Sequence, residues 1–337
     1  YLTNNVTLTE TLTISSGTVN LCLNGHTISN GTNSTYNVIE VSAGATLNIC
    51  DCQTTAGSII SNSADTYGEA IDNFHGTVNV YGGSIRATGN IGNGIYNGYG
   101  TVNVYGGSIS AATGNLYYGI YNYIGTVNVY DGSISATDGS NYGISNFKGT
   151  ATVSGGTISG SSFGIQNTSS DASLTISGSA SVIGGNYGIN NYHGNLQLSG
   201  SPNINGEIAD ISLEGSTTPT IDIVGVLTNT EKYTVTTNQK PAADTPVVFT
   251  SAVDEGNADK FESADSAYQV IYEGGVLKLA VSSATPAHAH DMSVACGGSS
   301  VTFEPWSGTG TPSGNVYLTD DVPLTETLTI SSGTVNL

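Results

Sequence analysis

The chain has 337 residues, of which 9% are charged, and its formal net charge is −20 at pH 7. Six Lys and Arg side chains cannot supply the clustered positive charge that binds nucleic-acid phosphates or an anionic membrane surface, so we expect neither partner. No apolar run reaches the roughly 18 residues that suggest a membrane-spanning helix, so we expect no membrane insertion.

The excess of carboxylates could gather Ca²⁺, but the GGxGxDxUx nonapeptide of calcium-binding solenoids is absent. We therefore expect no cofactor, with calcium as the weaker alternative. Negative charge also favours solubility, because copies of the molecule repel one another.

The first 21 residues of the chain recur at its end. Residues 1–21 read YLTNNVTLTETLTISSGTVNL, and residues 317–337 read YLTDDVPLTETLTISSGTVNL, so three positions differ. The offset of 316 residues indicates one whole repeating unit followed by the start of the next. Stacked identical units propagate along one axis, so this pattern predicts a tandem array or a filament.

Residues 1–201 are predicted to form the coils of a solenoid, less regular at the start and regular over 66–201. The early part contains three of the four cysteines, Cys22, Cys50 and Cys52, and the fourth is Cys296. An even count in a chain poor in lysine favours an oxidising, extracellular location and structural disulfides over free thiols or a metal site. The sequence leaves the three pairings open. One hypothesis is that Cys296 bonds across the junction to the next unit's copy of Cys22.

A finer period lies inside the unit. GTVNVYGGSI begins at Gly76 and Gly100, GTVNVYDGSI at Gly125 and GTATVSGGTI at Gly149, and the pattern decays from Ser173 onward. Steps of about 22–25 residues with alternating apolar positions predict three short strands per coil. The fold class is thus all-β, a single-stranded parallel β-helix, and right-handed because crossovers between parallel strands almost always are.

In-register coils place equal residues above one another, about 4.8 Å apart. Val78, Val102 and Val127 are expected to stack inward. An asparagine follows the coil isoleucine two residues later in six successive coils. We interpret this column as structural, because asparagine at a corner tolerates the left-handed conformation, caps the backbone of the turn and bonds to stacked amides. These residues are Asn73, Asn97, Asn122, Asn146, Asn167 and Asn191.

An outward column of aromatic residues runs along the same coils. Its members are Tyr81, Tyr105 and Tyr130, flanked by Asn79, Asn103 and Asn128. The rings could simply stack on one another, which stabilises the coil. They could also hold sugar rings, with the amides bonding to hydroxyl groups, so this face is a candidate glycan-binding site.

The fine period fails from Pro202 onward. Residues 202–281 still contain strand-like runs and a Gly-Gly turn, so we interpret them as terminal coils and a cap hairpin. Residues 282–316 are expected to be a linker or junction, and residues 317–337 the start of the next tandem unit.

The runs LCLNGHTI (residues 21–28), ATLNICDC (45–52), CGGSSVTFEPW (296–306) and the GTVNVYGGSI coils together resemble tandem β-helix repeats of large cell-surface proteins of Firmicutes. More distantly they resemble the pectate-lyase-like right-handed β-helix superfamily. The resemblance implies a secreted, wall-attached or filamentous protein with a scaffolding or adhesive role. It carries no catalytic residues with it.

Enzyme chemistry finds little support in the coils. A polysaccharide lyase needs a base near clustered acidic residues, yet the central coils offer Arg86 and Lys148 at different coil positions. A hydrolase needs two facing carboxylates, and Glu69 and Asp72 have no acidic counterparts in later coils. We therefore expect no enzyme but a structural unit of an extracellular filament or stalk, joined head to tail to copies of itself. A carbohydrate-binding adhesin is the alternative, and a lyase or hydrolase is less favoured.

Overall fold

The computed structural model describes residues 1–32, 34–63, 68–89, 92–111, 117–136, 138–139, 141–215, 217–242, 245–282, 288–290, 301–306 and 316–318. The chain divides into two units, Tyr1–Ala280 and Val281–Leu337.

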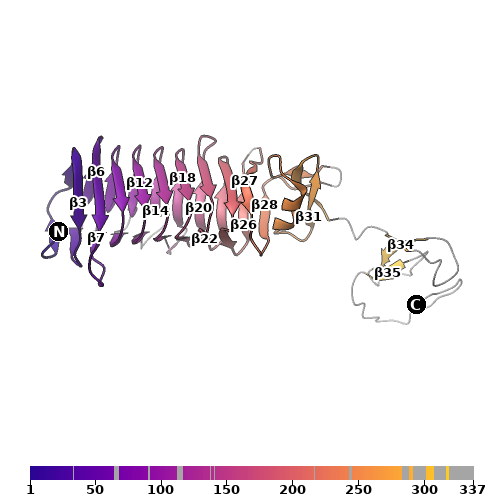
Figure 1. Cartoon of the computed structure of the whole chain (residues 1–337), viewed down its shortest axis with the longest axis horizontal. Coiled ribbons are helices and arrows are strands. Elements are labelled where there is room, and N and C mark those ends of the chain that lie inside the picture. Colours follow the sequence, from indigo (N-terminus) through magenta and orange to yellow (C-terminus); the bar gives the residue numbers. More distant parts are fainter. Residues whose placement is uncertain are drawn as a thin grey trace. The chain divides into compact units, whose positions relative to one another are not determined.

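The first unit is a stack of coils, each of which contributes one short strand to each of three parallel sheets (Figure 1). Sheet A contains β1 (Val6–Leu8), β4 (Thr27–Asn30), β7 (Ser58–Ser61), β10 (Ser84–Ala87), β13 (Ser108–Ala111), β16 (Ser133–Ala136), β19 (Thr157–Gly160), β22 (Ser181–Gly184) and β25 (Asn203–Gly206). Sheet B contains β2 (Leu12–Ile14), β5 (Ile39–Val41), β8 (Ile71–Asn73), β11 (Ile95–Asn97), β14 (Tyr118–Asn122), β17 (Tyr142–Asn146), β20 (Phe163–Asn167), β23 (Tyr187–Asn191), β26 (Ala209–Leu213), β28 (Tyr233–Thr237) and β30 (Phe261–Ser263). Sheet C contains β3 (Gly17–Cys22), β6 (Ala45–Cys50), β9 (Thr77–Val80), β12 (Thr101–Val104), β15 (Thr126–Val129), β18 (Thr150–Val153), β21 (Ser173–Ile176), β24 (Asn195–Gly200) and β27 (Ile221–Leu227).

Every strand of the regular coils pairs in parallel with the equivalent strand one coil away. Val102 of β12 lies opposite Val78 of β9 on one side and Val127 of β15 on the other, which confirms the predicted stack. The fold is therefore the predicted all-β parallel β-helix. Its right-handed winding stays a prediction from the crossover rule.

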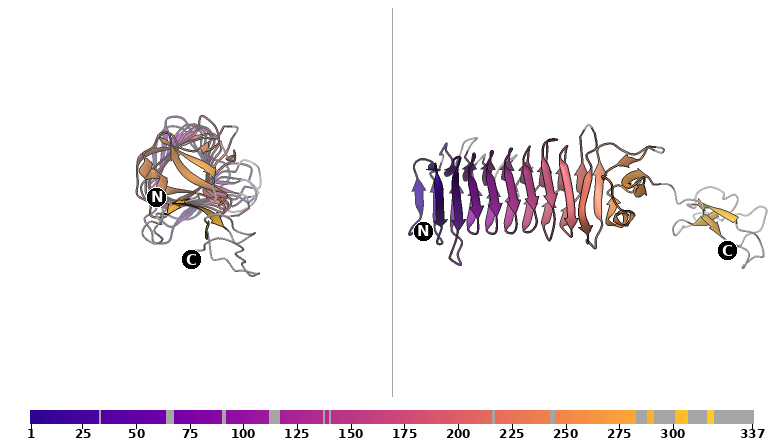
Figure 2. Two further views of the ribbon diagram at one scale, coloured as in Figure 1. Left: turned by 90° about the vertical axis from the view of Figure 1, so that its right-hand side faces the viewer. Right: turned by 45° about the horizontal axis from the view of Figure 1, so that its top comes forward.

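Alternating burial along each strand explains why the sequence folds this way. In β12 the two valines are fully buried, while Thr101 and Asn103 are half-buried on the outside. The buried side chains of all three sheets form one core that follows the coil axis, and the coils superpose when seen along that axis (Figure 2). Each added coil thus buries the apolar inner side of its neighbour.

The first coils are longer than the regular ones. The asparagines at equivalent positions of sheet C are 28 residues apart between Asn20 and Asn48 and 31 apart between Asn48 and Asn79, against 24 between Asn79 and Asn103. The extra residues form the connections between the strands, so the register of the sheets is kept.

Residues 202–281 add β25 to sheet A, β26, β28 and β30 to sheet B, and β27 to sheet C. A short 3₁₀ helix, Glu255–Lys260, precedes β30, and β29 (Val247–Val248), β32 (Val276–Val281) and β31 (Tyr268–Glu273) form a small separate sheet. The expected Gly-Gly turn is Gly274–Gly275, where φ values of 64° and 81° favour glycine.

The second unit contains a three-stranded sheet in the order β33 (His288–His290), β34 (Val301–Trp306) and β35 (Val316–Leu318). Strand β33 is antiparallel to β34, whereas β35 is parallel to it. The segment expected to be a linker therefore includes two strands. Of the second copy of the 21-residue sequence, residues 319–337 lie outside the described part.

Candidate functional site

The asparagine column is buried within the turn between sheets B and C. All six side chains are fully buried, and each Nδ2 from Asn73 to Asn167 donates to the Oδ1 of the next asparagine at 2.8 Å. Most Nδ2 atoms also reach backbone carbonyl oxygens, for example Asn97 to Gly100 at 3.1 Å. The amides thus bond to the coil itself and are inaccessible to a ligand.

The left-handed conformation, which asparagine tolerates, is not adopted by these six residues. Among the described residues, the non-glycine residue with positive φ is Asn24, at 52°. The column members instead adopt strand conformation at the ends of their strands in sheet B. The stacking amides, rather than an unusual backbone, therefore account for asparagine at this position.

Apolar residues end the amide column on both sides. Asn73 lies opposite Val41 in the preceding coil, and Asn191 lies opposite Leu213 in the following coil. Valine offers no donor to the Asn73 Oδ1, which is buried without a hydrogen-bond partner. The hydrogen-bonding groups at this end of the column are therefore less completely paired than those in its middle.

The predicted glycan face is an ordered ladder on the outside of sheet C. Adjacent rings of Tyr81, Tyr105 and Tyr130 have centroids 4.9 Å apart and planes 7° and 4° from parallel. Their exposed fractions are 53%, 41% and 49%. Because each inner ring face is covered by its neighbour, the edges and hydroxyl groups are what the column presents to solvent.

A second amide chain runs beside the tyrosines. Asn128 donates to Asn103 at 2.9 Å, Asn103 to Asn79 at 2.8 Å, and Asn79 to Asn48 at 2.7 Å. These side chains are half-buried, so unlike the inner column they remain open to solvent on one side. The arrangement brings all six predicted face residues together over three consecutive coils.

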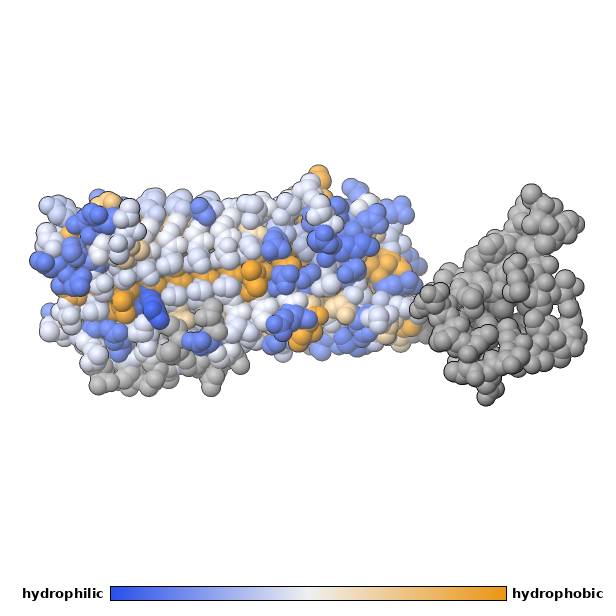
Figure 3. Space-filling view, turned by 90° about the horizontal axis from the view of Figure 1, so that it is seen from below, coloured by the Kyte–Doolittle hydropathy of each residue, from blue (hydrophilic) through white to orange (hydrophobic). Residues whose placement is uncertain are grey.

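Elsewhere on the surface, strongly polar and strongly apolar residues are unevenly spread. Figure 3 shows a mostly pale middle of the coil stack, crossed by a narrow hydrophobic band along the long axis, with more hydrophilic residues toward the ends. No helix among the described residues has the length and apolar character needed to cross a membrane.

Acidic side chains cluster where sheet B passes from its second to its third coil. Glu40 lies directly opposite Asp72, and Asn37 bridges the cluster by accepting from the Glu69 backbone N–H at 3.1 Å and donating to the Asp72 Oδ2 at 3.0 Å. Asn93 donates to the Glu69 Oε1 at 3.4 Å. The sequence placed Glu69 and Asp72 together but gave no sign of Glu40, which precedes them by one irregular coil.

Burial changes the protonation of this cluster. Loss of hydration raises the pKa of Glu69 to about 7, with a smaller contribution from the charge of Asp72. Loss of hydration, followed by the charge of Glu40, raises the pKa of Asp72 to about 6. The described residues nevertheless contain no group of three or more His, Cys, Asp or Glu arranged to bind a metal.

The three described cysteines meet at one edge of the first two coils. Cys22 and Cys50 are register partners in β3 and β6, and the Sγ atoms of Cys22 and Cys52 lie 2.9 Å apart. All three are free thiols, so the expected disulfides are not formed among them, and Cys296 lies outside the described residues. The hydrogen bond with Cys52 lowers the pKa of Cys22.

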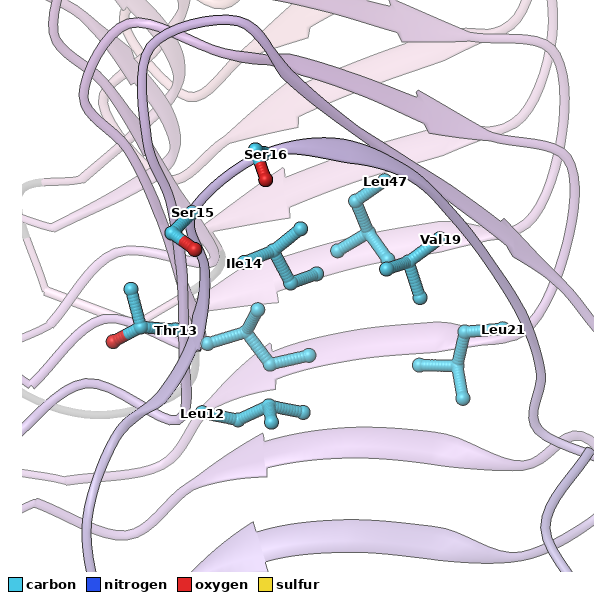
Figure 4. A pocket seen from close by; sticks show the side chains of 9 residues that line it. Leu12, Thr13, Ile14, Ser15, Ser16, Val19, Leu21 and Leu47 are labelled. Atoms are coloured by element: carbon cyan, nitrogen blue, oxygen red, sulfur yellow. The ribbon is translucent and has the colours of Figure 1, made fainter.

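The first coil leaves an open cavity of about 290 Å³ at the end of the stack. Figure 4 shows Leu12, Ile14, Val19 and Leu21 projecting into it, with Thr13 on the other side of its strand. The hydroxyl groups of Ser15 and Ser16 lie at the rim, so the lining contains no titratable side chain.

No family model matches the chain, and comparisons with curated proteins and with solved structures find no match either.

Proposed function

We propose that the chain is a structural repeat unit of an extracellular filament or cell-surface stalk, in which units join head to tail. The observation that carries the proposal is the 316-residue repeat superimposed on a parallel β-helix. A solenoid of stacked coils resists bending because each coil is hydrogen-bonded along its length to the next. Repeating such a body along one chain gives a long, thin scaffold.

Several features support a scaffold over an enzyme. Glu69 and Asp72, whose pKa values are raised, are hydrogen-bonded to amides, and the cavity of the first coil has no titratable lining. The sequence resemblance to Firmicutes surface repeats, and distantly to pectate-lyase-like β-helices, agrees with a non-catalytic role outside the cell. We include an oxidising location, where cysteine pairs form disulfides, in the same proposal.

Removal of residues 317–337 tests the head-to-tail role. Assemblies of the shortened chain, imaged by electron microscopy, should be shorter than those of the whole chain, because the start of the next unit is missing. A chain with residues 317–337 in scrambled order is the control for length and should behave like the shortened one. Fibres of unchanged length from both variants would contradict the proposal.

A carbohydrate-binding adhesin is the second candidate, and the exposed tyrosine edges beside half-buried amides favour it. The double substitution Tyr105→Ala and Tyr130→Ala should then weaken binding to a glycan array. Phe147→Ala, in an aromatic stack on the other side of the turn, is the matched control and should leave binding unchanged. A wild-type chain that binds no glycan would rule this candidate out.

A further inference from the structure

The first coil exposes apolar side chains that later coils bury. Leu12 is 42% exposed and Val19 is 40% exposed, whereas their register partners in the second coil, Ile39 and Leu47, are fully buried. Each of β1, β2 and β3 is also an edge strand of its sheet. Unpaired strand edges around an apolar opening recruit another strand or chain.

The hydrogen bonds of the first residues show where such a strand would add. The Leu2 backbone N–H donates to the Cys22 carbonyl oxygen at 3.0 Å, and the Asn24 side chain donates to the Leu2 carbonyl oxygen at 2.9 Å. Leu2 therefore repeats, one level before the first coil, the bond that the Leu23 backbone N–H makes to the Cys50 carbonyl oxygen just past the end of a sheet C strand. Tyr1 is 85% exposed, so the outer edge of this segment faces solvent.

The second unit contains a copy of Tyr1–Leu2, and there another strand is paired with it. Tyr317 and Leu318, the counterparts of Tyr1 and Leu2, belong to β35, and β34 pairs with them in parallel. Pro305 lies opposite Tyr317, and Trp306 lies opposite Leu318. Parallel, in-register pairing is the relation between consecutive coils, so β34 occupies the place of a coil that precedes the 21-residue sequence.

Strand β33 is placed as the cap of a solenoid would be. It pairs antiparallel with the other edge of β34, so the parallel series stops there. An antiparallel strand on the last edge prevents further coils from stacking, which is what a solenoid end requires.

We propose that the segment with β33 and β34 is the N-terminal cap of this β-helix, supplied to the first coil by a preceding copy of the chain. Strand β34 of one copy adds in parallel to Tyr1–Leu2 of the next, and the segment covers the opening lined by Leu12, Ile14, Val19 and Leu21. The two copies of the 21-residue sequence agree at 18 positions, so the pairing at one transfers to the other. This inference rests on the proposed head-to-tail function and names its contact.

The contact is tested by photo-crosslinking between two copies of the full chain, one of them labelled with ¹⁵N. A benzoylphenylalanine replaces Ser15 at the rim of the opening, and the crosslinked peptides are identified by mass spectrometry. We expect crosslinks to residues 288–306 of the labelled copy. The same group at Ser133, an exposed position in the middle of the stack, should give none. Crosslinks from position 15 to the first coil of the other copy, or no crosslinks between copies that do associate, would overturn the inference.

Substitutions test each side of the proposed contact in turn. Leu12→Lys with Val19→Lys should raise the dissociation constant between copies more than about tenfold, since both side chains would lose burial. Val226→Lys, at a 78% exposed position of β27, should leave it unchanged. Phe303→Pro should act like the double lysine variant, because β34 is the central strand of its sheet and a proline removes one of its hydrogen bonds.

The outcomes distinguish this contact from the broader function. If chains join into linear oligomers and Phe303→Pro does not weaken them, head-to-tail assembly stands and the cap is wrong. If single chains stay monomeric, the crosslink is sought within a polypeptide of two consecutive units. Its absence there also overturns the cap, while imaging of that polypeptide decides the head-to-tail function separately.

Discussion

At the level of single residues, the coil is held by side chains that bond to their own copies in neighbouring coils. The inner asparagines do this in the dry turn and the outer asparagines do it at the surface, with nearly the same Nδ2–Oδ1 distances. The energetic difference between the two columns therefore comes from burial. An unsatisfied polar group costs about 1–3 kcal/mol when buried and little when water can replace the lost partner.

Asn97→Ala and Asn103→Ala compare the two columns within one coil. Loss of the Asn97 amide leaves a donor on Asn73 and an acceptor on Asn122 without that partner. It also removes the second hydrogen bond of the Gly100 carbonyl, which keeps its bond from the Thr126 backbone N–H. We expect Asn97→Ala to lower the free energy of unfolding by about 3 kcal/mol or more, and Asn103→Ala by less than about 1 kcal/mol. Urea unfolding followed by circular dichroism measures both, and equal losses would contradict the assigned roles.

Glu69 should make stability depend on pH. Its pKa is raised to about 7 in the folded chain, so the folded form binds the proton more tightly than the unfolded form does. Stability therefore falls as pH rises from the ordinary glutamate pKa, about 4.5, to about 7, by up to about 1.4 kcal/mol per pH unit. Asp72 contributes in the same direction at lower pH, up to about 6.

The substitution Glu69→Gln isolates this effect. The variant should lose most of the slope between about pH 6 and pH 7, where Glu69 is the main contributor. Glu10→Gln, at an exposed position of the first coil, should keep the wild-type slope. Urea unfolding at several pH values gives the slopes, and a wild-type slope in Glu69→Gln would show that the burial of this carboxyl is wrongly assigned.

At the level of strands and coils, the sequence predicted the regular part because its period leaves one way to stack it. Only one register places Val78, Val102 and Val127 in a column and turns every intervening polar residue outward. The acidic cluster could not be predicted in the same way. Glu40 and Asp72 are 32 residues apart across an irregular coil, so no repeated sequence aligns them.

At the end of the stack the sequence predicted terminal coils and a cap hairpin but not the strand pairing, for a different reason. Strand β27 shifts register against β24 between Leu198 and Gly200, and β29 and the 3₁₀ helix lie between β28 and β30. Such irregularities end a repeat and give its last coils a sequence of their own. Strand β33 was missed because the small and polar residues before it are typical of a linker, and β34 was missed because it lies outside the repeating coil pattern.

The first coil lies at one end of the stack, and a disulfide would link it covalently to the second coil. Exchange with oxidised glutathione would join the Sγ atoms of Cys22 and Cys52 and release two glutathione thiols, so that two S–H bonds are replaced by one S–S bond. We expect non-reducing peptide mapping to find this pair after oxidation, since these sulfurs are already in contact. The closed loop of 30 residues should stabilise the fold by about 3.6 kcal/mol.

Single substitutions check this pairing. Cys50→Ser should still form the bond, whereas Cys52→Ser should not. A dominant Cys22–Cys50 peptide, or complete alkylation of Cys22 after oxidation, would show that the contact does not lead to a bond.

At the level of the whole molecule, the sequence combines two periods, one of about 22–25 residues that makes the coil stack and one of 316 residues that repeats it. The short period predicts stiffness within a unit. The long period predicts that a unit ends where the next begins, and the strands β34 and β35 lie across that point in the sequence. A structural function follows if successive units keep a fixed orientation across this junction.

The most direct measurement of this claim is electron microscopy of a polypeptide with two consecutive units. We predict a single straight particle, about twice the length of one coil stack, with a narrow distribution of angles at its middle. Two rods that meet at widely varying angles, or that fold back on each other, would contradict the claim that these units build a continuous extracellular fibre.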